Sequence, residues 1–412
     1  MQSRQKSPVL WVTSMFLCIV VCFDLIGLFT PDKEFSETEN RMLAQFPEFS
    51  SKSVSEGTAG EDAEKYLSDQ FAFRDAWSAI SFFTKSKLLG QKEINGVYIG
   101  KDGYLMMIPS DPEPEAMKAK LSAINAVTDK YSDLHHCIAV IPNAATVMTN
   151  KMPSYVPDSK QPGQLSYISA MLNGITFCDV TKSFKKHRYE ELYYHTDHHW
   201  TSRGAYLAFT DIAPDMQIDP DEYQYDIYTV SDSFQGTLAS KSGSYAYNDR
   251  IEIYVPQGEH PVSVRYSDED DANGSIYQKK YLDTKDKYAL FLGGNHPVVT
   301  ITTTADADRT LMLIKDSYAN CFVQFLIPYF DQIIIVDPRY CYDSVDMLIN
   351  QYEITDLLYL YNADTFMTDT SLTDFLTFES SQDDETFESS QDDETIESSQ
   401  DDETIESSQD NQ

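Results

Sequence analysis

Apolar runs and helical segments alternate near the carboxyl end of the chain. Three short runs rich in Leu, Ile and Val are typical of buried strands: Thr310–Ile314, Gln332–Val336 and Leu357–Tyr361. Between them, Tyr318–Phe330 and Tyr342–Gln351 have the length and apolar spacing of helices. Because strand–helix–strand units of this length form right-handed crossovers, the pattern predicts an α/β fold with a parallel sheet flanked by helices.

The rest of the folded region shows helical and strand periodicities as well. Residues 213–300 are rich in Tyr, Thr, Ser, Asp and Gly and contain alternating runs, which predicts a strand-rich insertion. Together these elements predict one α/β domain over residues 61–377. The other expected elements are a helix over Ala63–Leu89, a hairpin over Gly96–Leu105 with its turn at Asp102-Gly103, a helix over Pro112–Lys130, a buried strand over Cys137–Ile141 and a helix over Thr201–Ile212 with Thr201 as its N-cap.

An apolar segment stands near the amino end. Pro8–Phe29 contains one charge, Asp24, and is as long as the stretch of about 20 residues that a helix needs to cross a bilayer. Basic residues precede it, so the positive-inside rule predicts a cytoplasmic stub and single-pass transmembrane anchor over residues 1–30, with the bulk of the chain extracytoplasmic. The alternative is a cleaved signal peptide; no clear small-x-small cleavage site follows, which favours the anchor. Residues 31–60, rich in Ser, Glu and Gly, predict an extended stalk.

A nine-residue acidic repeat occupies residues 378–412. FESSQDDET starts at Phe378, recurs from Phe387 and returns with an initial Ile from Ile396. One apolar residue per repeat cannot build a core, so this segment is predicted to be disordered. A solvated spacer is favoured over a cation-binding or adhesive tail, because acidic low-complexity segments mostly stay solvated.

Composition narrows the classes of function. The chain has 31 Lys and Arg against 66 Asp and Glu, a formal charge of -35, which argues against nucleic-acid binding because phosphates need a basic face. Its six Cys form no Cys-x-x-Cys pair, so a structural zinc site is not expected. The chain contains neither a G-x-G-x-x-G nor a Walker sequence, and no soluble cofactor is predicted.

Polar residues follow four of the predicted strands. In a parallel sheet the chemistry gathers at the carboxyl ends of the strands. These ends carry Asn143, Ser317, Asp337 with Arg339, and Asn362. A Ser on the turn from a buried strand into a helix has the geometry of an exposed nucleophile, next to N–H groups that can bind an oxyanion. Ser317 stands at such a position, although a strand-end Ser is also a common helix N-cap.

The string Asp197-His198-His199-Trp200 lies ahead of a predicted helix. A Ser hydroxyl needs a base, and a His is an effective base when a carboxylate holds its tautomer. Asp197 and one of the two His residues supply both groups from one loop, which predicts acyl transfer through a Ser ester. Metal binding is a weaker alternative, since His195, Asp197 and His199 alternate and would share one face of a strand. His198 is expected to point away from His199, and Trp200 to pack under the loop. For Arg339, a structural salt bridge is favoured over contact with a substrate.

The string resembles the signature of the bacterial DHHW protein family, which is similar to extracytoplasmic alginate O-acetyltransferases with SGNH-hydrolase-like domains. Asp197, His199 and Trp200 match that family's Asp-x-His-Trp motif, and Asp316-Ser317 match its downstream Gly-Asp-Ser motif, with Lys315 in place of Gly. The resemblance spans roughly residues 35–370. It implies an SGNH-like sheet in circularly permuted order and matches Asn362 to the oxyanion-hole Asn.

The resemblance also implies an activity. Ser317 would be the nucleophile, His199 the general base and Asp197 the orienting carboxylate of an O-acetyltransferase that acts on a cell-surface polysaccharide or cell-wall glycan. A membrane-bound acyltransferase partner would deliver the acetyl group. Two alternatives stay open: a carbohydrate O-acetylesterase on the same triad, and a non-catalytic glycan-binding protein of the cell envelope. The sequence contains no residue that decides whether water or a sugar hydroxyl resolves the acyl-enzyme.

Overall fold

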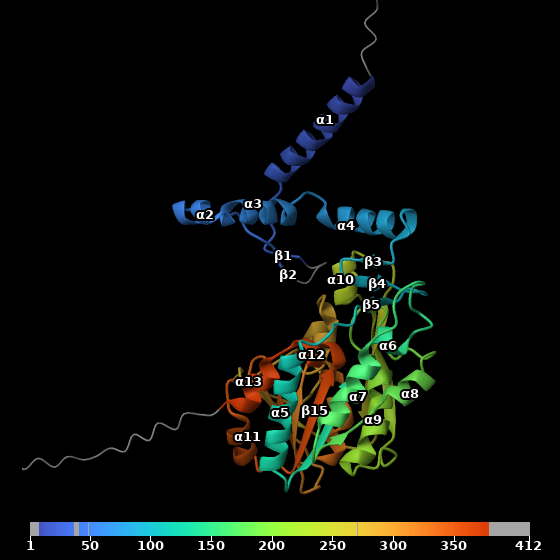
Figure 1. Cartoon of the computed structure of the whole chain (residues 1–412), viewed down its shortest axis with the longest axis vertical. Helices are drawn as coiled ribbons and strands as arrows, with labels where there is room; N and C mark the ends of the chain where they lie inside the picture. The colour runs from blue at the N-terminus through green and yellow to red at the C-terminus, as the bar shows by residue number, and fades with distance from the viewer. Residues whose placement is uncertain (1–7, 37–40, 48, 270, 379–412) are drawn as a thin grey trace, which may run out of the picture. The chain divides into compact units, whose positions relative to one another are not determined.

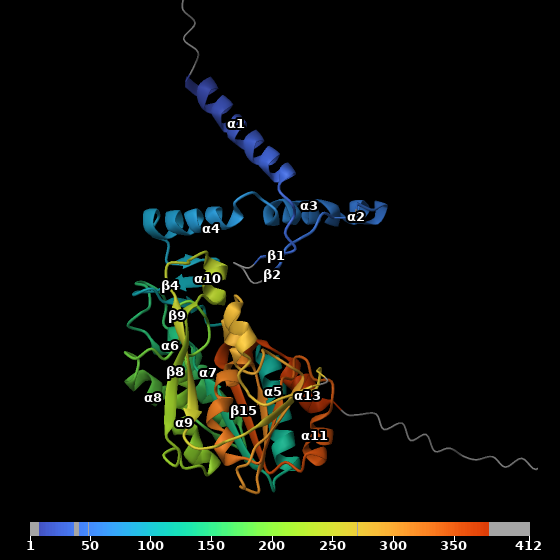
Figure 2. The same ribbon diagram turned by 180° about the vertical axis from the view of Figure 1, so that it is seen from behind.

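The structure is a computed structural model that describes residues 8–36, 41–47, 49–269 and 271–378. It is drawn in Figures 1 and 2. The predicted disorder of the acidic repeats concerns residues that lie, apart from Phe378, outside this described part of the chain.

A mostly parallel sheet of eight strands forms the centre of the fold, in the order β11-β10-β12-β14-β13-β15-β6-β7. The strands β14, β13, β15, β6 and β7 run parallel, while β12, β10 and β11 continue the sheet in antiparallel fashion. All four predicted buried strands are present. The bounds are β6 His135–Ile141, β7 Thr176–Phe177, β10 Ser263–Tyr266, β11 Ala272–Asn273, β12 Val298–Thr302, β13 Thr310–Lys315, β14 Gln332–Val336 and β15 Asp356–Asn362.

Side chains of the central strands alternate between two apolar layers. On β13, Leu311 and Leu313 join one buried cluster, and Met312 and Ile314 join the other. Because both faces of these strands are buried, their sequences are continuous apolar runs, and this is why the sequence pattern predicts them. The helices α5 Pro114–Lys130, α7 Gln161–Met171, α11 Val345–Gln351, α12 Ala363–Thr368 and α13 Ser371–Thr377 cover one face; α9 Ser202–Ile212 and the strand pair β8 Tyr225–Phe234 and β9 Asp249–Pro256 lie toward the other (Figures 1 and 2).

The segment 213–300 is rich in strands, as predicted, and its strands belong to two different sheets. Among the described residues of this segment, β8 and β9 pair with each other as a separate two-stranded sheet. The strand β10 pairs with β12, and β12 pairs with the edge of β14. Val264 and Tyr266 of β10 alternate toward the core, so this half of the segment extends the main sheet.

The apolar helix predicted over Tyr318–Phe330 is wrong. The chain forms three short 3₁₀ turns instead, η5 Ser317–Cys321, η6 Val323–Phe325 and η7 Ile327–Tyr329. Every residue from 318 to 330 is buried, so the conformation of this segment is set by tertiary packing on all sides. Pro328 also lacks the N–H that an α-helix would need there. The next helix, α11, begins at Val345 rather than at Tyr342, because the Ser344 side chain caps it there.

In the segment before the sheet, the structure differs from the sequence predictions in two places. The extended stalk contains the strands β1 Phe35–Ser36 and β2 Arg41–Met42, but its second half is helical, with α2 Ser51–Glu56 and the start of α3 Thr58–Asp69. The helix expected over Ala63–Leu89 is interrupted after Asp69, and it resumes as α4 Arg74–Phe83 and the π-helical turn η1 Thr84–Leu88. Phe73 adopts a left-handed conformation with φ of 59°, which no α-helix accommodates.

Other local predictions are confirmed. The hairpin consists of β4 Val97–Ile99 and β5 Leu105–Met107, with β3 Glu93–Ile94 added at its edge. Asp102 and Gly103 both have positive φ, as a hairpin turn with the favoured twist requires. Thr201 caps α9 by accepting a hydrogen bond from the Gly204 N–H.

The first helix, α1 Pro8–Phe29, is long and apolar enough to span a membrane. A signal sequence near an amino terminus would satisfy the same criteria of length and composition.

Candidate active site

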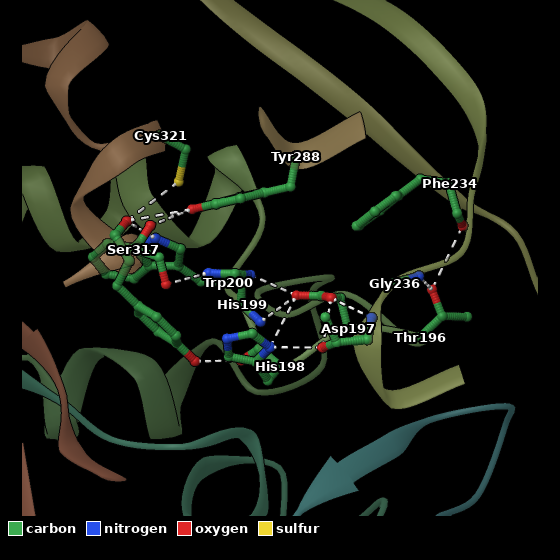
Figure 3. Close-up of polar contacts among 12 residues, drawn as sticks. Thr196, Asp197, His198, His199, Trp200, Phe234, Gly236, Tyr288, Ser317 and Cys321 are labelled. Atoms are coloured by element: carbon green, nitrogen blue, oxygen red, sulfur yellow. Dashed lines mark hydrogen bonds and ion pairs between the residues drawn. The ribbon is translucent and has the colours of Figure 1, made fainter. Parts of the chain in front are cut away.

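Ser317, His199 and Asp197 form a continuous hydrogen-bonded chain (Figure 3). The His199 Nε2 lies 2.8 Å from the Ser317 Oγ, and the His199 Nδ1 lies 2.5 Å from Oδ1 of Asp197. Because a carboxylate only accepts, Nδ1 carries the proton and Nε2 is free to accept from the hydroxyl. His199 and Asp197 are buried, while Ser317 is partly exposed. The arrangement can activate a hydroxyl nucleophile.

The loop that holds Asp197 and His199 is closed at its base. Tyr193 pairs with Trp200 in an antiparallel bridge, and the Tyr194 N–H donates to the His199 carbonyl at 3.2 Å. At the tip, the Asp249 carboxylate on β9 accepts hydrogen bonds from the N–H groups of His195 and Thr196, both at 2.8 Å. The loop is therefore fixed both by its own closure and by the neighbouring strand.

The Asp197 carboxylate is almost completely satisfied by donors. Besides the His199 ring, it accepts from the His199 N–H at 3.0 Å and from the Thr237 N–H and hydroxyl at 2.7 and 3.0 Å. Burial alone would raise the pKa of Asp197, but the adjacent His198 and His199 rings and these hydrogen bonds hold it well below its usual range. Asp197 is consequently ionised and orients the imidazole.

His198 does not point away from His199, contrary to the prediction. Their ring centroids lie 3.9 Å apart, and the His198 Nδ1 lies 2.8 Å from the Thr237 hydroxyl. The prediction assumed strand-like alternation, but residues 195–199 form a series of bends. Burial and the adjacent His199 ring lower the pKa of His198 to about 4. A neutral His198 ring therefore covers the side of His199.

Contacts on both sides of Ser317 position its backbone. The preceding Asp316 is buried and accepts from the N–H groups of Tyr318 and Asn362, both at 3.0 Å. It thus joins the turn after β13 to the end of β15. The indole N–H of Trp200 donates to the Tyr318 carbonyl at 2.9 Å, and the ring is fully buried, so Trp200 packs under the loop as predicted.

Tyr288 contacts both His199 and Ser317, and the sequence did not predict it as part of the site. Its ring stacks on His199 with a centroid distance of 3.9 Å and an interplanar angle of 15°. Its hydroxyl donates to the Ser317 carbonyl at 3.1 Å (Figure 3). Tyr288 lies in a region with many tyrosines and carries no motif, so its local sequence contains no signal for this role.

The other polar strand ends divide into two kinds. Asn143 is hydrogen-bonded to Gln161, and Asp337 forms ion pairs with Lys315 at 3.1 Å and Arg339 at 2.6 Å. Arg339 is thus structural, as expected. Asn362 differs from these residues. Its side-chain oxygen accepts from the Asp364 N–H at 2.9 Å, whereas its buried Nδ2 has no hydrogen-bond partner among the described residues.

The metal-binding alternative is not assembled as predicted. The His195 ring stacks between Tyr104 and Tyr247 and its Nδ1 lies 3.1 Å from Asp249, so it belongs to a different contact set. Ligand atoms of Asp197, His198 and His199 do lie within 4.8 Å of one another. The hydrogen bond from His199 to Asp197 uses these same atoms, and the second nitrogen of His199 faces Ser317. This geometry suits a proton-transferring His.

Comparison with known proteins assigns the family. The model of the DHHW protein family matches residues 124–336, just over half of the chain. The chain belongs to the DHHW protein family. The matched range of this DHHW protein contains the loop from Asp197 to Trp200 and ends on β14 beyond Ser317; Asn362 lies outside it. The search of curated proteins finds no sequence match.

Solved structures share the fold. A DHHW family protein from Eubacterium siraeum aligns with a TM-score of 0.58 and 22% identity, over 68% of this chain and 95% of the other. Bacillus cereus PatB1, solved with a sulfonyl adduct, aligns with a TM-score of 0.57 and 19% identity, over 68% and 97%. At these identities the likeness establishes the fold of this DHHW protein.

Proposed function

We propose that this DHHW protein is an extracytoplasmic O-acetyltransferase that acts on a cell-surface polysaccharide or cell-wall glycan through an acetyl ester of Ser317. The observation that carries the proposal is the placement of His199 between the Ser317 hydroxyl and the Asp197 carboxylate. The choice of an acetyl group rests on the resemblance of the Asp-x-His-Trp and Asp-Ser motifs to the acetyltransferase family. The domain would be SGNH-like, with its strands in permuted order.

In the first half-reaction, His199 Nε2 takes the proton of the Ser317 hydroxyl while Oγ attacks the acetyl carbonyl. The tetrahedral intermediate collapses, the bond to the donor breaks, and His199 returns the proton to the leaving group. In the second half-reaction, His199 takes a proton from a sugar hydroxyl, whose oxygen attacks the acetyl-Ser ester. Ser317 leaves with that proton, and the acetylated glycan is released.

Two donors are available for the negative charge of the intermediate. Ser317 is the first residue of η5, and N–H groups at the start of a helix have no intrahelical acceptor. The Nδ2 of Asn362 is the second, because it is buried at the end of the adjacent strand β15 and lacks a partner among the described residues. A buried donor without an acceptor costs stability, which is expected where a substrate supplies the acceptor.

The placement in the cell belongs to the same proposal. The helix α1 would anchor the chain with its amino end in the cytoplasm, and residues 61–377 would form the extracytoplasmic catalytic domain after the segment 31–60. An acetyl donor from the cytoplasm would then have to be delivered by a membrane-bound acyltransferase. Residues 378–412 would be a solvated acidic spacer.

The test uses the full chain in detergent micelles and three proteins: wild type, Ser317→Ala and Ser166→Ala. Ser166 is exposed on α7 and serves as the matched control. Wild type and Ser166→Ala should hydrolyse 4-nitrophenyl acetate, and Ser317→Ala should lose at least about 100-fold of that activity. A sulfonyl fluoride, the class of reagent suggested by the PatB1 adduct, should modify Ser317 in a peptide map.

Added oligosaccharide acceptors separate the transferase from the esterase. Acetylated oligosaccharide as the product supports the transferase, whereas free acetate alone identifies an esterase on the same triad. An unlabelled Ser317 together with equal hydrolysis by wild type and Ser317→Ala would refute acyl-enzyme chemistry and favour the glycan-binding alternative.

A further inference from the structure

The helix α4 has an apolar face that stays largely exposed, apart from its contact with Phe23 of α1. Phe73, at the N-cap of α4, and Trp77, Ile80 and Phe83 within it are 65%, 42%, 53% and 56% exposed. They follow one another at intervals of three or four residues, so they share one side of the helix. We call these four residues the α4 apolar face. Exposed aromatic side chains in such a row mark an interaction site rather than ordinary surface.

Most of this face is directed away from the catalytic domain, although Trp77 also borders a cavity that residues 240–243 line from the other side. The opposite side of α4 carries Ser78 and Phe82, which approach Gly243 at the end of α10 Thr237–Ser242. A β-carbon on Gly243 would lie 3.0 Å from the Ser78 carbonyl oxygen and 3.6 Å from Cβ of Phe82. Figures 1 and 2 both show α4 beside α10. At 100° per residue, Ile80 and Phe73 lie on the other side of the helix from Ser78 and Phe82.

The charge beside this face is unusual for the chain. Residues 76–92 contain Lys85, Lys87 and Lys92 and no acid, although acids outnumber bases two to one overall. Lys85 and Lys87 lie in η1, directly after α4. A strip of aromatic and aliphatic residues with Lys at its end is complementary to the surface of a phospholipid bilayer, where rings enter the headgroup layer and ammonium groups meet phosphates.

The same face continues onto the candidate membrane helix. Phe23 of α1 contacts the rings of Phe71, Phe73 and Trp77, with centroid distances of 5.7, 6.5 and 5.5 Å. Phe23 lies in the last third of α1, the end that would reach the outer surface of the bilayer. The α4 apolar face therefore begins where α1 would leave the membrane.

From these contacts we infer that α4 is an interfacial helix that lies in the outer headgroup layer of the membrane, with the α4 apolar face in the lipid and Lys85 and Lys87 on phosphates. The inference rests on the proposed membrane placement of α1. Its consequence is a second attachment of the catalytic domain to the bilayer, through the contact of α4 with Gly243. The site of Ser317 would then be held at a defined distance from the membrane surface.

Trp77 provides a direct test in the full chain. Trp11→Phe leaves Trp77 and Trp200, and Trp200 is fully buried. This variant is reconstituted into vesicles of phosphatidylcholine with phosphatidylglycerol, with and without brominated phosphatidylcholine. The inference predicts that brominated lipid quenches most of the Trp77 emission and that Lys85→Ser with Lys87→Ser weakens the quenching.

Two control proteins make the result decisive. Trp77→Phe retains Trp11, whose quenching reports insertion of α1 independently. Trp11→Phe/Trp77→Phe/Tyr342→Trp places a Trp at an exposed position next to α11, which should not be quenched. If lipid quenches Trp11 but not Trp77, α1 spans the membrane and the interfacial placement of α4 is overturned. If lipid quenches neither Trp, the membrane placements of both α1 and α4 are overturned. A blue shift of Trp77 that depends on protein concentration but not on lipid would identify a second copy as the occupant and also overturn the inference.

Discussion

Gly236 and Asp197 are packed so closely that no side chain fits between them. A β-carbon on Gly236 would lie 2.2 Å from Oδ2 and 2.3 Å from Cβ of Asp197. Gly236 precedes α10, whose first residue Thr237 donates two hydrogen bonds to the same carboxylate. The glycine therefore allows α10 to approach near enough to hold Asp197 in place.

The first prediction concerns this contact. Gly236→Ala should displace Asp197 and rotate His199 away from Ser317, so kcat/KM for the acetyl ester should fall by about 100-fold, as expected for a misplacement of about 1 Å. Thermal unfolding measured in parallel should show a loss of stability as well. The matched control is Gly163→Ala in α7, where an added Cβ meets no atom within 4 Å. Wild-type kinetics of Gly236→Ala would show that this contact is not needed to position Asp197.

The second prediction concerns the pH dependence of stability. In the folded protein His198 has a pKa of about 4, below its ordinary value of 6.5. Between these values the unfolded chain binds a proton that the native state does not, so native stability falls as pH drops from 6.5 to 4. His198→Gln should remove a part of this slope, up to about 3 kcal/mol across the window.

The measurement is a set of urea unfolding curves for both proteins from pH 4 to pH 8. Above pH 7 their difference in unfolding free energy should be constant, since His198 is then neutral in both states. Parallel curves throughout the acid range would show that His198 titrates normally in the folded protein.

The third prediction tests Tyr288 as a positioning residue. Tyr288→Phe keeps the ring stacked on His199 but removes the hydrogen bond to the Ser317 carbonyl, so activity should fall by about fivefold, in line with the loss of about 1 kcal/mol. Tyr288→Ala removes both contacts and should cost about 100-fold. Because the ring touches the base, the pH profile of kcat/KM should shift in Tyr288→Ala, which a purely structural role would not produce.

Tyr277 supplies the control for that pair. Its hydroxyl lies 3.1 Å from both Gln324 Oε1 and the Tyr254 carbonyl oxygen, apart from the triad. Tyr277→Phe should lower the free energy of unfolding about as much as Tyr288→Phe does, and it should leave kcat/KM unchanged. If Tyr277→Phe reduced activity as much as Tyr288→Phe, a general loss of rigidity would account for both.

The fourth prediction addresses Asn362 as an oxyanion donor. Asn362→Ser keeps a side-chain oxygen that can cap α12, where Ser is nearly as good as Asn. It removes the Nδ2, for which the described part of the chain provides no hydrogen-bond acceptor. kcat should fall by about 100-fold with little change in KM, because the donor acts on charge that develops in the transition state. The unfolding midpoint should stay close to that of the wild type. A rise in KM alone would assign Asn362 to ground-state binding instead.

Much of this fold was predictable because its signals are local. The strands β6, β13, β14 and β15 are buried on both faces, so consecutive residues along each run are apolar. The turn at Asp102-Gly103 and the Thr201 cap depend on a few adjacent residues. The segment from Tyr318 to Phe330 shows the limit, since its apolar spacing suits a helix but tertiary packing divides it into three short 3₁₀ turns.

The amino-acid sequence alone defined the strand order along the chain, the strand end at Ser317 and the carboxylate–imidazole loop at Asp197. The tertiary structure decided which groups meet. His199 and Ser317 are 118 positions apart and 2.8 Å from each other, and neither Tyr288 nor Gly236 carries a local signal for its contact. Such contacts depend on how distant segments pack, because burial and steric fit are properties of the assembled core, whereas periodicity and capping are properties of neighbouring residues.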